Sequence, residues 1–252
     1  MTTAERIIKL GSGDTFAEFA AKMNNVSPGN LRTMWIARPS DLLTSISIGP
    51  DKRVWTYNAT IAGRTSKLGD GVLVTFNGSS ETVTSPDTAN MSLGDGSTDS
   101  AWSVAAIGNI TNTAGYRDFV NKPLEWGLSV DSSDKLYMYL RDDSAGVYSE
   151  RHVSVASTQG SVHLFGCSYD GGGGATAANG IVMYEDAVVK ASSATNNAAY
   201  VASENLTGTP TMGGTNFFAG SIGFVAVYAA NLTTSQHVSI KTACNAYFRT
   251  SL

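Results

Sequence analysis

The sequence has little charge, few cysteines and no long apolar run. Lysine, arginine, aspartate and glutamate make up 15% of its 252 residues, and the net charge is −4, whereas an average soluble domain is about one quarter charged. A surface without excess positive charge lacks the main source of affinity for nucleic acids. No stretch approaches the roughly 20 apolar residues that cross a bilayer. We therefore expect no nucleic-acid binding and no membrane insertion.

Only two cysteines are present, Cys167 and Cys244, and two cannot build a disulfide framework. Cys167 lies in an apolar run and Cys244 in an expected helix, so we predict two buried thiols. A single Cys167–Cys244 disulfide is the alternative.

The N-terminal segment lacks the apolar core of a signal peptide. Glu5, Arg6 and Lys9 place charges where that core would have to lie. We expect a protein that is synthesised in the cytoplasm without an export signal.

From Arg53 onward the sequence is rich in short β-like runs. Clusters of Gly, Asp, Ser and Asn separate them, and these residues tolerate the backbone angles of tight turns. This spacing is typical of an antiparallel β-sandwich or barrel. The runs are 54–62, 72–76, 102–110, 124–130, 135–141, 152–157, 161–169, 180–189 and 222–230.

One β-hairpin is predicted in detail, with its turn at 130–135. Apolar residues alternate on both sides of this polar turn, so they should all point inward. These residues are Leu124, Trp126, Leu128 and Val130 before the turn, and Leu136, Met138 and Leu140 after it.

Two helices are expected, one near each end of the chain. Over 15–24, Phe16, Phe19 and Met23 share one helical face. At the C-terminal end, a capping threonine or serine at 233–235 precedes an apolar face that includes Ile240, Cys244 and Phe248. We expect this second helix to lie against the edge of the sandwich.

Residues 1–50 differ in character from the rest. Two strand-like runs, 31–37 and 42–48, follow the first helix and are broken by prolines. We interpret residues 1–50 as an N-terminal arm with a short helix, whose apolar face serves assembly, and 51–252 as the β-sandwich. Alternatively, the first fifty residues supply the sandwich's first strands.

The glycine run at 171–174 raises the question of a phosphate site. Gly172, Gly174 and Ala177 fit the loose pattern G-x-G-x-x-A. A phosphate site also needs a helix N-terminus to offer free amides, whereas Asn179-Gly180 followed by alternating residues predicts a hairpin. We therefore predict a flexible loop between antiparallel strands.

Three segments carry a family resemblance. Residues 73–110, with Phe-Asn-Gly, Pro-Asp and Trp-Ser, resemble the opening of laminin-G-like domains of the concanavalin A-like jelly-roll group. Residues 162–189 and 212–236 are similar to a middle strand pair and to the closing signature of that family. The resemblance implies an all-β antiparallel jelly-roll sandwich over about 70–250. The family often has Asp where Gly223 stands, so any role of that Asp is absent here.

A hydrolase on this fold is a weaker alternative. Related glucanases carry Glu-x-Asp-x-x-Glu on one strand, and this pattern is missing. No Gly-x-Ser-x-Gly is present, and His152, His163 and His237 lie far apart in the sequence. We therefore predict a protein that is not an enzyme and that uses no cofactor.

Calcium is the one ion that the resemblance suggests. Laminin-G-like domains often bind Ca²⁺ through rim-loop aspartates, and this chain has several aspartates in loops. Aspartate is also a common turn residue, and no metal motif is present, so no metal site is assigned. The loop aspartates are Asp95, Asp99, Asp131, Asp134, Asp142, Asp143 and Asp170.

Aromatic residues give the candidate glycan contacts. Tyr116 lies in a polar stretch, and Tyr169-Asp170 precedes the glycine run. An exposed tyrosine beside a carboxylate can stack on a sugar ring and bind its hydroxyls. We predict Tyr116, Tyr169 and Asp170 as glycan-binding residues, with ordinary core or surface tyrosines as the alternative.

These observations favour a non-enzymatic virion structural protein. Laminin-G-like modules of neutral Gly/Ser/Thr/Ala-rich composition resemble components of bacteriophage virions, in capsid decoration, tails or fibres. Its expected partners are other virion proteins, copies of itself and, weakly, cell-surface glycans. The alternatives are a free-standing carbohydrate-binding lectin module and, less favoured, a glycoside hydrolase of the same fold.

Overall fold

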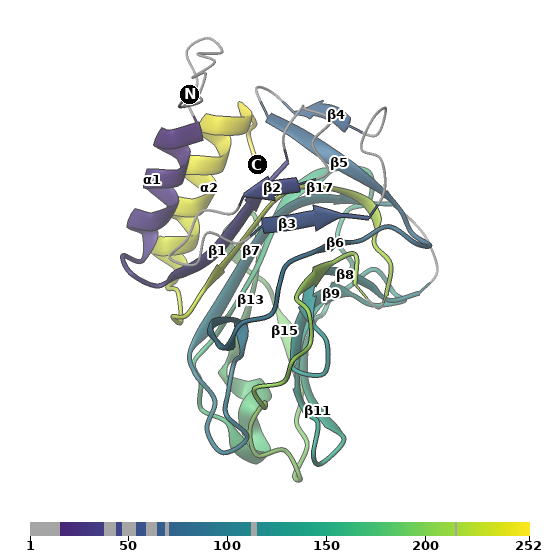
Figure 1. Ribbon diagram of the computed structural model, residues 1–252, viewed down its shortest axis with the longest axis vertical. Coiled ribbons are helices and arrows are strands. Elements are labelled where there is room, and N and C mark those ends of the chain that lie inside the picture. Colours follow the sequence, from purple (N-terminus) through teal and green to yellow (C-terminus); the bar gives the residue numbers. More distant parts are fainter. Residues whose placement is uncertain are drawn as a thin grey trace, which may run out of the picture.

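Two antiparallel β-sheets pack face to face, and two helices cover one of them (Figure 1). The computed structural model describes residues 16–37, 44–46, 54–58, 65–68, 71–111, 115–214 and 216–252. The predicted all-β jelly-roll sandwich with one helix near each end is confirmed. No helix in these ranges is both long and apolar enough to cross a membrane.

The first sheet, sheet A, includes the strands nearest the helices. Its strands follow the order β14 (Val188–Val189), β13 (Ile181–Glu185), β12 (Val162–Tyr169), β7 (Trp102–Ile110), β17 (Ala219–Tyr228), β5 (Gly71–Asn77) and β4 (Thr65–Leu68), and β1 (Leu31–Ile36) also pairs with β17.

The second sheet, sheet B, forms the opposite layer. Its order is β15 (Ser192–Thr195), β11 (Val147–Val153), β10 (Leu136–Asp142), β9 (Trp126–Val130), β8 (Arg117–Lys122), β16 (Thr211–Met212), β6 (Val83–Thr84), β3 (Val54–Tyr57) and β2 (Thr44–Ile46). Two short 3₁₀ helices, η1 (Ala89–Met91) and η2 (Gly174–Gly180), lie in the connections.

The main core fills the space between the two sheets. Trp102 of sheet A contacts Trp126 of sheet B edge to face, with 4.9 Å between ring centroids. Fully burying a large apolar side chain contributes about 1.5–3 kcal/mol. The predicted hairpin is β9–β10, in which Val130 pairs with Leu136. Its alternating residues reach this core, except Leu124, which is 43% exposed in the turn before β9.

Some strand boundaries differ from the prediction. The run predicted at 152–157 corresponds to β11, which begins at Val147 and ends at Val153, because β10 and β11 form a hairpin around 143–146. The strand predicted at 180–189 is two strands, β13 and β14, separated by a turn at Asp186 and Ala187. The strand predicted at 54–62 begins as β3, and its residues 59–62 lie outside the described residues.

A second core lies between sheet A and the two helices, α1 (Phe16–Val26) and α2 (Thr234–Phe248). The helices lie side by side on the outer face of sheet A (Figure 1). Sheet A is therefore buried on both faces: Ile107 of β7 points to the helices, and Val104 points to sheet B. The expectation that α2 lies on the sandwich's edge is wrong, because its apolar face covers the middle of the sheet.

The segment predicted as an arm is part of this packing. Phe19 and Met23 are fully buried in the second core, and the Tyr228 hydroxyl donates to the Met23 carbonyl at 2.9 Å. Strand β1 pairs with β17 from Leu31 to Ile36. Phe19 and Met23 therefore serve the fold, and only the half-buried Phe16 of the three predicted assembly residues keeps part of its surface.

The two cysteines are free and buried, as predicted. Cys167 belongs to the core between the sheets, whereas Cys244 belongs to the core under the helices. Sheet A separates the two thiols, and this arrangement excludes the alternative of a Cys167–Cys244 disulfide.

The start of α2 carries a capping box that can be tested. The Thr233 side chain accepts the Gln236 amide at 3.3 Å, and the Gln236 side chain accepts the Thr233 amide at 2.9 Å. We expect Thr233→Ala to lower the free energy of unfolding by about 1 kcal/mol. Urea denaturation measures it, with Thr234→Ala, exposed one residue later, as the control. Equal effects of both substitutions would contradict the capping role.

Candidate functional site

The glycine run does not form a phosphate cradle. Its amides already have partners within the chain: Gly172 donates to the Asp170 carboxylate at 2.8 Å, Gly173 to the Tyr169 hydroxyl at 2.8 Å, and Gly174 to the Val201 carbonyl at 2.7 Å. The segment connects antiparallel strands β12 and β13, as predicted. The hairpin predicted at Asn179-Gly180 is wrong, because these residues end the 3₁₀ helix η2.

Tyr169 is a buried structural residue and not a surface tyrosine. Its side chain is fully buried, and its hydroxyl donates to Asp99 Oδ2 at 2.6 Å. Tyr200 donates to the same oxygen at 2.8 Å. Burial raises the pKa of Asp99 against these hydrogen bonds. Asp170 is exposed, and its carboxylate caps the glycine run. Tyr169 and Asp170 therefore do not form the predicted glycan-binding pair of an exposed ring beside a carboxylate.

Tyr116 lies at the other end of the sandwich. Its neighbour Arg117 donates to the Thr111 carbonyl, just after β7, whereas Tyr169 pairs with Trp102 at the start of β7. A nine-residue strand spans about 26 Å between its end residues. The structure therefore separates Tyr116 from Tyr169 and Asp170. Tyr116 is 51% exposed and available to a ligand.

Tyr116 belongs to an aromatic row on the outer face of sheet B, which we call the tyrosine face. In β10, Leu136, Met138 and Leu140 point into the core, so the alternate residues Tyr137 and Tyr139 point outward. On β11, His152 pairs with Tyr137 and Tyr148 pairs with Arg141, so these two residues lie on the same outer face. The tyrosine face consists of Tyr116, Tyr137, Tyr139, Tyr148 and His152.

The rings of the tyrosine face contact one another in sequence. Ring centroids are 5.7 Å apart between Tyr116 and Tyr137, 6.1 Å between Tyr137 and Tyr139, and 5.9 Å between Tyr139 and Tyr148. His152 stacks on Tyr137 at 4.7 Å with planes 7° apart. The two terminal rings are the accessible ones, since Tyr116 is 51% and Tyr148 40% exposed while Tyr137 is buried.

Neighbouring residues fix the positions of these rings. Gly127 of β9 pairs with Tyr139, and a side chain at Gly127 would collide with the Tyr139 ring. The Arg141 guanidinium lies over the Tyr148 ring, 5.1 Å from its centroid, and Nη1 lies 2.5 Å from the Tyr148 hydroxyl. The Tyr148 ring is therefore held in place although it is exposed, which lowers the entropy lost on binding.

Buried polar groups on β8 and β9 lie beside the row. Asp118 on β8 is buried and accepts hydrogen bonds from Ser129 at 2.6 Å and from the Asn216 amide at 3.2 Å. Burial raises the pKa of Asp118. Asn121 of the same strand contacts both Asp118 and the Tyr139 hydroxyl. Asp118 and Asn121 are buried, so they support the rings from behind, and the exposed rings remain for contact with a ligand.

His152 lies between two carboxylates. Its Nδ1 is 3.1 Å from Asp131 Oδ2, and its Nε2 is 3.3 Å from Glu150 Oε2. The hydrogen bond to Glu150 and, with a smaller effect, the one to Asp131 raise the pKa of His152, and burial opposes this shift. The imidazole fills the space between the two carboxylates, so no scissile bond fits between them.

The backbones of Asp118 and Glu150 are farther apart than the two carboxylates of a glycosidase. They lie on β8 and β11, three strand spacings apart in sheet B, which is about 14 Å between backbones. The two carboxylates of a glycosidase are roughly 5–10 Å apart.

Most of the loop aspartates considered for calcium act as turn and ion-pair residues. Asp95 accepts the amides of Ser97 and Thr98, and Asp142 accepts that of Ala145. Asp134 forms an ion pair with Arg117, and Asp143 forms one with Arg141. Among the described residues, only His163, Glu185 and Asp186 bring three metal-ligating side chains together.

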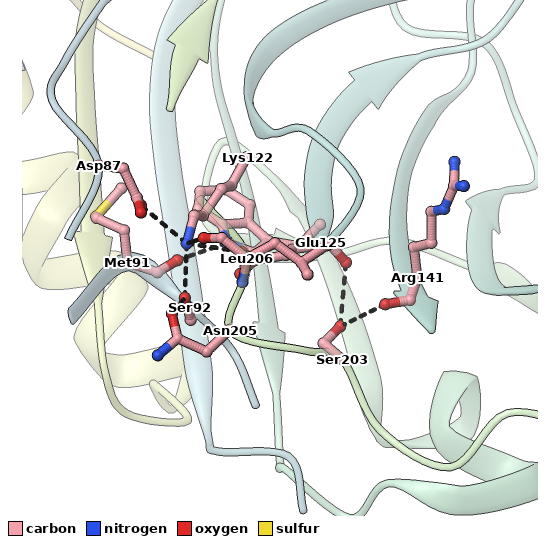
Figure 2. A network of polar contacts seen from close by, with 10 residues as sticks. Asp87, Met91, Ser92, Lys122, Glu125, Arg141, Ser203, Asn205 and Leu206 are labelled. Carbon is pink, nitrogen blue, oxygen red and sulfur yellow. Dashed lines mark hydrogen bonds and ion pairs between the residues drawn. The ribbon is translucent and has the colours of Figure 1, made fainter. Parts of the chain in front are cut away.

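A charged network is buried around Lys122, at the end of β8 (Figure 2). Lys122 is fully buried, and its Nζ lies 2.6 Å from Glu125 Oε1 and 2.9 Å from Asp87 Oδ1. Burial raises the pKa of Glu125 to about 7 in spite of its hydrogen bond with Lys122. Figure 2 also shows Ser203, whose hydroxyl donates to the Glu125 and Arg141 carbonyls. Lys122 and Glu125 have no exposed surface, so we assign the network to stability.

Of the tyrosine face, only Tyr116 was predicted from the sequence as a binding residue. The run at 135–141 reads Lys-Leu-Tyr-Met-Tyr-Leu-Arg, so its inward leucines and methionine imply two outward tyrosines. That signal was present. Tyr148 was missed because its strand, β11, was predicted to begin at residue 152, whereas it begins at Val147.

No family model matches this sequence, and no curated protein matches it. Solved structures that share the fold are distant. The binding domain of Paraclostridial Mosquitocidal Protein 1 has a TM-score of 0.62 at 10% identity, covering 84% of this chain and 52% of that one. Domain 4 of AbnA, a GH43 extracellular arabinanase from Geobacillus stearothermophilus, in complex with arabinotriose, has a TM-score of 0.56 at 14% identity, covering 84% and 99%.

A third similar structure is of botulinum neurotoxin type C, whose cell entry is described as dependent on interaction with two ganglioside molecules. Its TM-score is 0.58 at 10% identity, covering 88% of this chain and 52% of that one. This chain thus spans about half the length of the two toxin structures and nearly all of the arabinanase domain. At these identities the likeness supports the β-sandwich fold.

Proposed function

We propose that this chain is a non-enzymatic glycan-binding β-sandwich, and that the tyrosine face is its binding surface. The observation that carries the proposal is the exposure of Tyr116 and Tyr148 at the two ends of a row of contacting rings. Exposed tyrosines are large and amphipathic, and they lose little conformational entropy on binding. The arabinotriose complex of the arabinanase domain supports an oligosaccharide as the ligand.

The charges of the face favour an uncharged glycan. Asp131 and Glu150 flank His152, and Asp118 lies behind the rings. Arg141 is paired with Asp143 at 2.6 Å, so its positive charge is largely balanced. A sialylated or sulfated chain would approach these carboxylates at an electrostatic cost. A neutral oligosaccharide would not.

Substitution of the exposed rings tests the binding surface. We expect Tyr148→Ala and Tyr116→Ala each to weaken binding about fivefold or more, since an aromatic contact contributes about 1 kcal/mol. Calorimetry with arabinotriose and other neutral oligosaccharides measures the affinity, and sialyllactose serves as the anionic comparison. Val238→Ala, on the exposed side of α2, is the control.

The proposal fails if a broad array of neutral glycans gives no signal with the protein displayed at high density, where multivalency amplifies weak contacts. It also fails if glycans bind and both tyrosine variants bind equally well.

We further propose that the protein acts within a virion, as a decoration, tail or fibre component, together with copies of itself. The low content of charged residues supports this reading, because a neutral polar surface suits packing against other subunits. Electron microscopy of particles labelled with an antibody to this chain tests it. A chain recovered only as a free monomer, never with particles, would favour the lectin alternative.

A further inference from the structure

We propose that His163, Glu185 and Asp186 form a Zn²⁺-binding site at the edge of sheet A. The three residues come from adjacent parts of the sheet. His163 lies on β12, Glu185 is the last residue of β13, and Asp186 is the next residue, in the turn before β14. Glu185 pairs with Phe165, so the side chains of Glu185 and His163 point to the same side of the sheet. This site is independent of the tyrosine face.

The ligand atoms of the three side chains lie close to the separations that a tetrahedral zinc ion requires. One ligand atom from each residue lies within 4.8 Å of the others, and His163 Nδ1 is 2.8 Å from Asp186 Oδ2. Zinc bonds of about 2.0–2.2 Å place tetrahedral ligands about 3.3–3.5 Å apart. A rotation of the half-buried Glu185 side chain closes the remaining gap. One imidazole with two carboxylates is a donor set that zinc accepts, with water in the fourth position.

Other groups already hold the two carboxylates in position. The Leu164 amide donates to Asp186 Oδ1 at 2.9 Å, which leaves Oδ2 facing His163. The Ser157 hydroxyl donates to Glu185 Oε2 at 2.7 Å. Such hydrogen bonds to ligating carboxylates orient metal ligands and raise affinity. Asp186 is therefore held toward His163 before the ion binds, and the Glu185 side chain has to rotate to join them.

Two lysines lie near the carboxylates. Lys190 Nζ is 3.5 Å from Glu185 Oε1, and Lys241 Nζ donates to the Asp186 carbonyl oxygen at 3.2 Å. The nitrogen that faces the carboxylates is His163 Nδ1, and both carboxylates lie on that side of the ring. The contrast is His152, whose two carboxylates approach opposite ring nitrogens and cannot converge on one ion.

Zinc titration of the untagged full chain tests the site. By calorimetry, we expect saturable binding of one Zn²⁺ per chain. His163→Gln and Asp186→Asn should each weaken it at least about tenfold. Asn tolerates the positive φ of 53° at position 186, so the second variant preserves the turn. His152→Gln is the matched control and should bind zinc as the parent does.

A gain of affinity separates ligation from a loss of folding. Lys190→Met removes the cation beside Glu185, so we expect it to bind Zn²⁺ several-fold more tightly than the parent. Circular dichroism confirms that each variant is folded. The proposal is overturned if the parent shows no saturable binding, if folded His163→Gln binds equally well, or if Lys190→Met binds no more tightly.

Discussion

Replacing Lys122 by methionine is expected to lower the free energy of unfolding by about 3–5 kcal/mol. The substitution keeps much of the side chain's volume, so the loss is electrostatic. It leaves the Glu125 carboxylate fully buried without its partner at 2.6 Å, and it also removes the donor to the Leu206 carbonyl at 2.8 Å. A buried carboxylate without a counter-charge carries the full cost of desolvation.

The defect should depend on pH in a defined direction. Burial raises the pKa of Glu125 from its usual 4.5 to about 7. Because this pKa is higher in the folded protein than in the unfolded chain, the folded protein binds more protons between about pH 4.5 and pH 7. The free energy of unfolding that Glu125 contributes through this proton is therefore lost as the pH rises through this range. Without Lys122 the carboxylate is harder still to ionise, so the variant should be less impaired at pH 5 than at pH 8.

Urea denaturation at both pH values measures these effects. Lys67→Met, on the exposed side of β4, is the control and should change stability by less than about 0.5 kcal/mol. The double variant Lys122→Met, Glu125→Leu should recover part of the loss, since it removes both charges. A loss below about 1 kcal/mol in Lys122→Met, equal at the two pH values, would show that the network is dispensable.

Replacing Phe19 by alanine is expected to cost about 3–5 kcal/mol. Phe19 is fully buried and contacts Tyr247, Phe224 and Phe248, with centroids at 4.7, 5.5 and 6.3 Å. Its ring joins α1 to α2 and to sheet A, and the surrounding sheet cannot collapse into the space it leaves. Thermal and urea unfolding measure the loss, and Asn24→Ala, exposed on the same helix, is the control.

The same contacts decide whether residues 1–50 act as an independent arm. A chain that starts at residue 46 would lose α1 and β1, and it would expose the apolar residues of the second core. We expect this truncated chain to bind a hydrophobic dye and to aggregate. A soluble, cooperatively folding truncation, together with a mild effect of Phe19→Ala, would restore the arm interpretation.

Sequence patterns predicted several strands and one hairpin. The strand predicted at 102–110 has the bounds of β7, and the hairpin around 130–135 has the predicted inward residues except Leu124. The hairpin was predictable because its two strands have a definite apolar phase and a polar turn between them. Helix positions were also predictable, since apolar spacing marks both helices and a capping threonine marks the start of α2.

The double burial of sheet A could not be read from one strand at a time. In β17, Ile222 and Val225 both face sheet B although three positions separate them. The register shift between Ile222 and Phe224 reverses the phase at Gly223. A local pattern that changes phase gives no clean alternation, so neither the bulge nor the place of α2 follows from it.

The candidate site was predictable only in part for a similar reason. Tyr116 stood out because its neighbours are polar, whereas Tyr169 has a polar sequence context and yet lies buried against Asp99. Whether a loop tyrosine points outward depends on which distant loop supplies its hydrogen-bond partner. That partner is 70 residues away in the chain.

The helices on sheet A give the molecule a front and a back. Because α1 and α2 occupy one broad surface (Figure 1), a polymer with many sugar units can reach the rings only from the opposite side. Many copies immobilised through α2 on a bead would thus all turn their tyrosines toward the medium. The same copies immobilised through β10 or β11 would hide their tyrosines against the bead. Glycan binding would therefore differ between the two orientations of the protein.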